Sequence, residues 1–147
     1  PSSLNDRSMV LKVTDRETAF LFTGDIEQRA EQVLMEEKGR FLRSRIMLSP
    51  HHGSRTSSSK GFLERVSPRI CIISCGENNR FGFPHRTTLN KLMALGCRVL
   101  RTDREGAIQV RASERRDGVE IRTFRNGWRS VFQGGGVGFP PRQKKGR

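Results

Sequence analysis

Short apolar runs alternate with segments of helical periodicity along most of this chain, and that alternation constrains the fold more than any other feature. Four runs have the length and composition of strands, at 19–24, 44–48, 69–74 and 97–102. Helical patterns separate them, from Asp25 to Gly39, from Ser58 or Ser59 to Pro68, and from about His85 to Leu95. Strands that alternate with helices in this way form a parallel sheet covered by helices. The sequence therefore predicts one α/β domain.

The two ends of the chain depart from this alternation. An extra strand at 8–13 precedes the first run across a polar turn, so we expect an antiparallel hairpin there. Two later runs, 106–112 and 118–124, are bounded by turn sequences and predict an antiparallel meander at one edge of the sheet. Residues 126–147 contain GGGVGFPP and little to bury, which predicts a mobile basic tail. The domain is thus expected to cover residues 1–125.

Local signals predict where helices begin and end and which side they bury. Asp25, with Gln28 three residues later, has the pattern of a capping box, and Gly39 is a typical helix end. In the helix at about 85–95, the residues expected on the buried side are Leu89, Leu92, Met93 and Leu95.

Composition narrows the classes of protein that the chain can belong to. The sequence has 28 Lys and Arg against 15 Asp and Glu, a formal charge of +13. Such a charge attracts polyanions, so nucleic acid, wall phosphate or an anionic membrane surface are the natural partners. Three cysteines make no disulfide framework, because Cys71 and Cys75 would lie about 13 Å apart on one face of a strand. The sequence shows no signal peptide and no apolar run of the roughly 18 residues that a membrane span needs.

Polar side chains cluster where the predicted strands end. Asp25 ends a strand in the segment TGD, and His51 and His52 follow the next strand in SPHHGS. Asn79 and His85 follow the strand after that, in GENNRFGFPH. The ends of parallel strands lie along one edge of an open sheet, where ligands bind. We therefore expect a carboxylate and two or three imidazoles around one point, although Asp25 alone would also serve as a helix cap and His85 as a first-turn residue.

The adjacent histidines are two of only three in the chain. Successive side chains of an extended segment point in opposite directions, so we expect one imidazole to bind a metal while the other faces substrate or supports the ligands. Gly53 permits a sharp turn directly after them. The hydroxyl side chains that follow can donate hydrogen bonds to phosphate oxygens: Ser54, Thr56 and Ser57.

Five segments in one collinear order resemble a known family. They are NDRSMVLKV, FLFTGDIEQRAEQVL, LSPHHGSRTSSS, PRICIISCGENNRFGFPHRTTLNKL and VLRTDREGAIQV. Together they resemble the metallo-β-lactamase-type domain of the ComEC/Rec2 competence proteins, from about Asn5 to Val110. The resemblance implies that the chain forms the C-terminal half of an αββα sandwich, with a mixed sheet and flanking helices. In that family the domain belongs to a polytopic protein of the cell (inner) membrane, lies on the extracytoplasmic side, and is thought to degrade the DNA strand that does not enter.

The resemblance also implies a site for two metals, Zn or Mn, that hydrolyses phosphodiesters. Asp25 would be the bridging carboxylate, and one of the two adjacent histidines a terminal ligand, with His52 slightly favoured. The other imidazole would lie near the scissile phosphate. The implied catalytic residues are His51, His52 and His85, the implied metal ligands are Asp25, His52 and His51, and the implied substrate-binding residues are Ser54, Thr56, Ser57 and Asn79.

The chain departs from the family pattern in two places. The upstream motif H-x-[HD]-x-D-H, which supplies the principal metal ligands, is absent, and the usual His-Pro pair is replaced by Phe83-Pro84. We therefore expect a metallohydrolase domain that is inactive as this chain alone and needs its N-terminal half, the membrane channel of the parent protein and DNA as partners. Two alternatives remain: a stand-alone hydrolase of another phosphoester or a lactone, and a non-catalytic basic remnant that binds nucleic acid.

Overall fold

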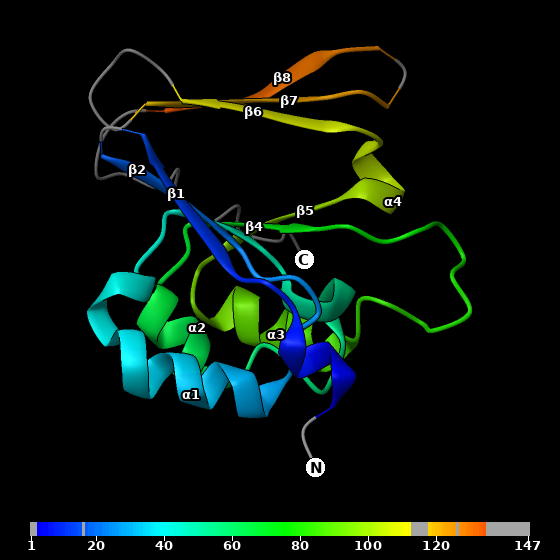
Figure 1. The fold of residues 1–147 in the computed structure, drawn as a ribbon. Helices are drawn as coiled ribbons and strands as arrows, with labels where there is room; N and C mark the ends of the chain where they lie inside the picture. Colours follow the sequence, from blue (N-terminus) through cyan, green and yellow to red (C-terminus); the bar gives the residue numbers. More distant parts are fainter. Residues whose placement is uncertain (1–2, 16, 113–117, 126, 135–147) are drawn as a thin grey trace.

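A five-stranded mixed sheet forms the centre of the computed structural model, which describes residues 3–15, 17–112, 118–125 and 127–134 (Figure 1). The strands follow the order β1-β2-β3-β4-β5 across the sheet. They are β1 (Leu11–Asp15), β2 (Thr18–Phe22), β3 (Ile46–Leu48), β4 (Ile70–Ile73) and β5 (Arg98–Arg101). β1 is antiparallel to β2, and the remaining neighbours are parallel. The predicted α/β class and the N-terminal hairpin are confirmed.

Three helices lie on one face of this sheet (Figure 1). They are α1 (Gln28–Lys38), α2 (Lys60–Val66) and α3 (Arg86–Ala94), with short 3₁₀ helices η1 (Leu4–Arg7), η2 (Gly39–Leu42) and η3 (Pro50–Gly53) around them. Leu21 and Met47 from the sheet pack in one buried cluster with Phe62 of α2 and Leu92 of α3. Each fully buried side chain of this size contributes about 1.5–3 kcal/mol, so the cluster fixes the helices on the sheet.

A second, three-stranded antiparallel sheet covers the opposite face (Figure 1). It consists of β6 (Ile108–Ala112), β7 (Val119–Thr123) and β8 (Arg129–Gly134). Ile46 and Ile70 of the first sheet pack against Val119 and Ile121 of β7. Because side chains alternate along a strand, Ile46 faces this second sheet while its neighbour Met47 faces the helices. That double burial explains why the central strands are almost wholly apolar.

The C-terminal strands differ from the expectation in two respects. The meander is a separate sheet rather than an edge of the first one, because the short helix α4 (Thr102–Glu105) redirects the chain after β5 into the other layer. The segment 126–147 was expected to be a tail, but it contributes β8 at Arg129–Gly134. Residues 135–147 lie outside the described residues, as does the expected turn at 113–117.

The expected capping box at Asp25 is wrong, because α1 begins only at Gln28. The helix start is instead capped from outside the local sequence. Asp6 of η1 accepts hydrogen bonds from the backbone N–H of Glu27 and of Ala30, at 2.9 and 3.4 Å. The consequence for function is direct, since the carboxylate of Asp25 is not used as a helix cap.

The other helix signals are confirmed in part. Gly39 ends α1, and the Ser59 side chain caps α2 by accepting from the N–H of Phe62. In α3 the buried side chains are Thr88 and Leu92, with Leu89 partly buried. The expectation that Met93 and Leu95 are buried is wrong, since they are 58% and 39% exposed.

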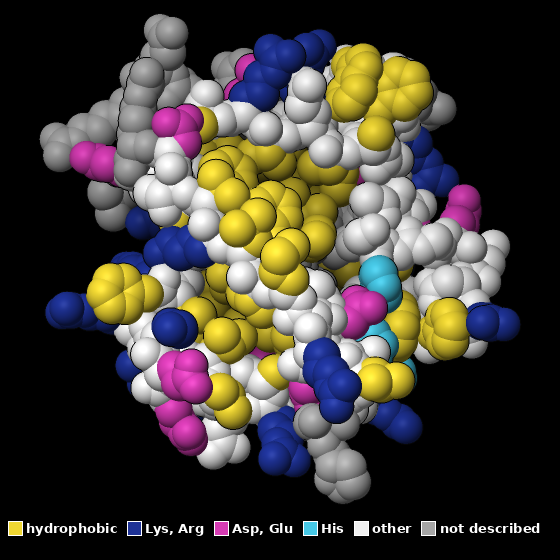
Figure 2. All heavy atoms as spheres, in the orientation of Figure 1, with side chains coloured by type: hydrophobic (Ala, Val, Ile, Leu, Met, Phe, Trp, Pro, Cys, Tyr) yellow, Lys and Arg dark blue, Asp and Glu magenta, His cyan; other side chains and the backbone are white. Residues whose placement is uncertain are grey.

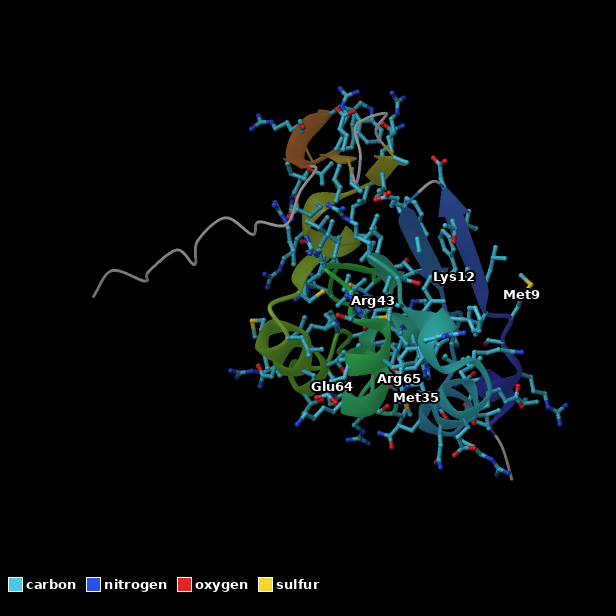
Figure 3. All side chains as sticks on the ribbon, turned by 90° about the vertical axis from the view of Figure 1, so that its left-hand side faces the viewer. Met9, Lys12, Met35, Arg43, Glu64 and Arg65 are labelled. Carbon is cyan, nitrogen blue, oxygen red and sulfur yellow. The ribbon has the colours of Figure 1, made fainter. Side chains whose placement is uncertain are left out.

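The hairpin end of the sheet is left open. β1 is an edge strand whose five residues are all exposed, and Leu11, Val13 and Phe22 are each more than 40% exposed. Figure 2 shows apolar side chains in a hollow between the two layers on the side that faces the viewer. Figure 3 shows Met9, which precedes β1, pointing away from the molecule, and Lys12 donates a hydrogen bond to the carbonyl of Phe41 at 2.7 Å.

Among the described residues, no helix combines the length and apolar character needed to cross a membrane.

Candidate metal centre

Three loops meet at the carboxyl ends of β2, β3 and β4, as the sequence predicts for neighbouring parallel strands. Backbone hydrogen bonds tie them together: the N–H of His51 donates to the carbonyl of Gly24 at 3.1 Å, and that of His85 to Gly53 at 3.0 Å. A third bond joins Ser49 to Ile72 at 2.8 Å. Figure 2 shows the histidine side chains gathered beside acidic and apolar side chains on the right-hand side of the view.

The two adjacent histidines have a left-handed backbone. His51 has φ 48° and ψ 47°, and His52 has φ 54° and ψ 22°. The expectation of an extended segment is therefore wrong, and the reason lies in the bonds just described, which turn the chain back towards the neighbouring loops. A left-handed residue other than glycine costs roughly 1–2 kcal/mol. Two such residues in succession persist only because the surrounding loops hold them.

Gly53 completes this turn with φ 81°. A Cβ atom at this position would lie 2.6 Å from Cβ of Pro84. Glycine is therefore required both by the backbone conformation and by the contact with the loop after β4. The turn holds the two imidazoles in fixed positions relative to that loop.

His52 faces Asp25. The Nδ1 atom of His52 lies 2.8 Å from the carbonyl oxygen of Ser74, and its Nε2 atom lies 3.6 Å from Oδ1 of Asp25. A carbonyl oxygen only accepts, so Nδ1 carries the proton and a neutral His52 presents a lone pair at Nε2. Two acceptor atoms then face each other, an arrangement that is favourable with a cation between them or with His52 protonated. The geometry thus pairs Asp25 with His52 rather than with His51.

His51 faces a second carboxylate. Its Nδ1 atom lies 3.3 Å from Oε1 of Glu27, at ion-pair distance, but it is buried and makes no hydrogen bond. The same Glu27 oxygen accepts from the hydroxyl of Thr56 at 2.8 Å. Glu27 is a site residue that the sequence analysis missed, although its position two residues after Asp25 was an available signal.

Phe83 lies among all three histidines. Its ring centroid is 5.6 Å from that of His51, 6.3 Å from that of His52 and 6.1 Å from that of His85. His85 itself precedes α3, and its carbonyl accepts from Thr88 and Leu89. The loops therefore bring together every imidazole of the chain, with an apolar ring at the centre.

The hydroxyl residues that were expected to bind phosphate have partners inside the protein. Ser57 is buried and donates to the carbonyls of Pro50 and Ser54, and the Ser54 hydroxyl lies 3.0 Å from that of Thr56. Asn79 is similarly occupied, since its side chain makes three hydrogen bonds to the backbone of Gly76 and Phe83. These contacts shape the two loops, and a phosphate would have to compete with them.

Glu31 of α1 holds the segment that follows the two adjacent histidines. It is fully buried, and its two carboxylate oxygens accept from the backbone N–H groups of Ser58 and Ser59 at the start of α2. Burial, opposed by these hydrogen bonds and by Lys91, raises the pKa of Glu31 above its ordinary value. Since Glu31 and Glu27 both belong to the start of α1, this helix is anchored to the histidine loop at two points.

A neighbouring cluster joins the ends of β4 and β5. The hydroxyl of Thr102 bonds to both the N–H and the carbonyl of Cys75, each at 2.8 Å, and Asp103 accepts from Arg101 and from the Cys75 thiol. The guanidinium of Arg101 lowers the pKa of the Asp103 carboxyl. Burial and the Asp103 carboxylate raise the pKa of the Cys75 thiol, which does not favour a thiolate nucleophile.

The donors at the loop junction suit a transition metal in type but supply only part of a site. Imidazole nitrogen and carboxylate oxygen are ordinary ligands of zinc and manganese, and a structural or catalytic site takes at least three protein ligands. Within the described part of the chain, no three His, Cys, Asp or Glu side chains come together as a metal-binding group. Asp25 and His52 thus fit as two ligands of a larger set.

The chain is an α/β protein with a mixed sheet, and in open α/β sheets the loops at the carboxyl ends of the parallel strands are the usual place for a ligand. No family model matches the chain, but curated relatives do. The chain is 36% identical over 115 residues to ComE operon protein 3 of Bacillus subtilis and 38% identical over 121 residues to competence protein ComA of Neisseria gonorrhoeae. It is 35% identical over 121 residues to recombination protein 2 of Haemophilus influenzae.

These matches cover 78% to 82% of the chain. The chain therefore belongs to the ComEC/Rec2 family of competence proteins, as its motifs indicated. It spans only 15% to 17% of the length of these relatives.

Proposed function

We propose that the chain is part of a metal-dependent phosphodiester hydrolase domain in a DNA-uptake protein. The observation that carries this proposal is the approach of His52 Nε2 to Asp25 Oδ1 at 3.6 Å, an atom pair that a metal ion could bridge when His52 is neutral. The competence proteins among the relatives supply the context, and the formal charge of +13 suits a polyanionic substrate. The domain would act on the strand that is not taken up.

Each residue at the loop junction has a defined part in this proposal. Asp25 and His52 would hold the metal, Zn or Mn, and the Ser74 carbonyl would keep the His52 lone pair directed at it. A divalent metal at such a site supplies positive charge that offsets the charge developing on the phosphoryl group. His51, held beside Glu27, would accept or return a proton near the scissile phosphate. His85, whose ring centroid lies 6.1 Å from that of Phe83, would contact the nucleic acid.

Completion of the site would come from another segment of the same domain. The open end of the sheet is suited to receive it, since the edge strand β1 has free pairing capacity and the apolar residues Leu11, Val13 and Phe22 are exposed beside it. We propose that the N-terminal half of the domain packs there and brings the further metal ligands. In this arrangement the chain alone would be inactive, and the domain would lie outside the cell membrane beside the channel of its parent protein.

The test is cleavage of linear DNA with Mn or Zn, by the chain alone and by the chain produced together with the rest of its domain. The proposal predicts cleavage only in the second case, and a loss of at least about a hundredfold in Asp25→Asn and in His52→Gln, in line with loss of a metal-binding residue or its support. Glu64→Gln, an exposed carboxylate on α2, is the control and should retain activity.

Two results would contradict the proposal. Cleavage that is unchanged in both variants would remove Asp25 and His52 from the reaction. Salt-sensitive DNA binding without cleavage, even with the rest of the domain present, would favour the non-catalytic nucleic-acid-binding alternative.

A further inference from the structure

An exposed aromatic ring stands next to the candidate site, on the loop that follows β4. Phe81 is 58% exposed. Its ring stacks on that of Phe83, with centroids 5.5 Å apart and planes inclined by 17°. Phe83 in turn lies 6.3 Å from the His52 ring, also stacked. Phe81 is thus the outer member of a row of rings that leads to the candidate metal ligand.

The loop that carries Phe81 is held in place. Asn79 accepts from the N–H of Phe83 at 2.9 Å and donates to the Phe83 carbonyl at 2.7 Å, which closes the loop across Phe81. Gly82, with φ 66°, makes the turn between the two rings. A ring that stacks on Phe83 and stands on a loop closed by these hydrogen bonds presents an ordered surface, so its contact with a ligand costs little conformational entropy.

The charge around this ring favours a nucleic acid. Arg80 lies over the Phe81 ring, 4.8 Å from its centroid, and the chain as a whole carries a formal charge of +13. Single strands are bound by aromatic side chains that stack on bases, combined with basic residues that contact the backbone. An exposed ring combined with an adjacent arginine, next to the candidate site, matches this chemistry.

We propose that the Arg80 guanidinium leaves the Phe81 ring to pair with a phosphate of a single-stranded nucleic acid, and that a base of the strand stacks on the ring face thereby freed. This contact would place the adjoining phosphodiester beside His52 and Asp25. The inference rests on the proposed function for what happens at the site, but the binding contact can be measured without cleavage. It assigns to Phe81 the role of a positioning residue, because the ring acts on the strand and not on the reacting atoms.

The chain offers a matched control on the opposite end of the molecule. Arg40 lies over Phe41 with 5.4 Å to the ring centroid, and Phe41 is 67% exposed. This pair has the same composition and a similar geometry as Arg80 and Phe81. It lies in η2, before β3 begins, whereas the candidate site lies where β3 ends.

The experiment is fluorescence anisotropy of a labelled single-stranded DNA with the full chain in EDTA, which prevents cleavage. Stacking of one base is worth about 1–3 kcal/mol, so Phe81→Ala should weaken binding by roughly 5- to 150-fold. Phe81→Leu should weaken it nearly as much, because leucine keeps the apolar bulk but has no aromatic face. Phe41→Ala should change the affinity less than about twofold. An unsubstituted chain should bind a strand of abasic sites as weakly as Phe81→Ala binds the normal strand.

Three outcomes would overturn the inference: no measurable binding of the single strand, equal affinity in Phe81→Ala and the unsubstituted chain, or an equal loss in Phe41→Ala. The result is independent of the proposed hydrolysis. Binding that depends on Phe81 in a domain that never cleaves would refute the hydrolase and keep the stacking contact. Cleavage that is unchanged in Phe81→Ala would refute the stacking contact and keep the hydrolase.

Discussion

Replacement of Glu31 tests how α1 supports the histidine loop. Glu31 is fully buried, and it satisfies two backbone N–H groups at the start of α2. Glu31→Ala would leave the buried N–H of Ser58 and the partly buried N–H of Ser59 without partners, at about 1–3 kcal/mol each. We expect a loss of roughly 2–5 kcal/mol in the free energy of unfolding, slightly less than the full sum, because water that enters the space would hydrogen-bond the two donors in part. Glu31→Gln keeps one acceptor oxygen and should lose about 1–3 kcal/mol.

The same residue predicts the direction of a pH dependence. The pKa of Glu31 is raised in the folded protein, chiefly by burial, so the folded state holds this proton more tightly than the unfolded state. Stability from this group is therefore fully present below the ordinary Glu pKa and is lost as the pH rises through the folded pKa. Glu31→Gln removes this pH dependence. The difference in free energy of unfolding between the unsubstituted chain and Glu31→Gln should therefore shrink as the pH rises from the ordinary Glu pKa through the raised pKa of the folded protein.

Urea unfolding followed by circular dichroism measures both effects. Glu64→Gln is the matched control, because Glu64 makes only an exposed pair with Lys60 at 3.8 Å and should change stability by less than about 0.5 kcal/mol. If Glu31→Gln and Glu31→Ala were both as stable as the unsubstituted chain, with the same pH dependence, the carboxylate would not hold the loop and the reasoning would fail.

Three further predictions concern the turn, the strand ends and the sheet edge. Gly53→Ala should lower stability by about 2–4 kcal/mol in thermal unfolding, because its Cβ would meet Pro84 at 2.6 Å and φ is 81°; an unchanged midpoint would contradict the packing of this turn. Asp103→Asn should lower the free energy of unfolding at neutral pH by about 1–3 kcal/mol, because the bond from Arg101 is weakened. The stabilisation from ionised Asp103 should be lost in the unsubstituted chain as the pH falls through the lowered pKa of Asp103, and the variant should lack this loss. An unsubstituted chain whose stability does not change with acid pH would refute this. The exposed edge strand β1 predicts that the chain self-associates, and Val13→Lys should reduce this association in analytical ultracentrifugation without unfolding the chain; unchanged association would place the contact elsewhere.

The sequence contained enough to predict the order of strands and helices and the meeting of three loops. Apolar runs of strand length alternate with helical periods, and that pattern is local. The ends of parallel strands then lie together for topological reasons, so Asp25, His51 and His85 could be placed near one another without coordinates.

Contacts between distant segments account for what could not be predicted. Asp25 looked like a helix cap, but Asp6, 21 residues before Glu27, takes that role. The left-handed backbone at the two histidines is imposed by bonds from neighbouring loops rather than by their own propensities. Likewise, turn sequences showed that the last strands pair with each other but not that α4 carries them into a second layer.

The pairing of Asp25 with His52 is tested most directly by nitrogen-15 NMR of the three imidazoles during a titration of the chain with zinc. The structure predicts that His52 carries its proton on Nδ1, where it meets the Ser74 carbonyl, and that zinc shifts its Nε2 resonance. The same shift should disappear in Asp25→Asn, while His85 should respond little in either protein. A His52 protonated on Nε2, or a zinc response that is equal at all three histidines and unaffected by Asp25→Asn, would contradict the account.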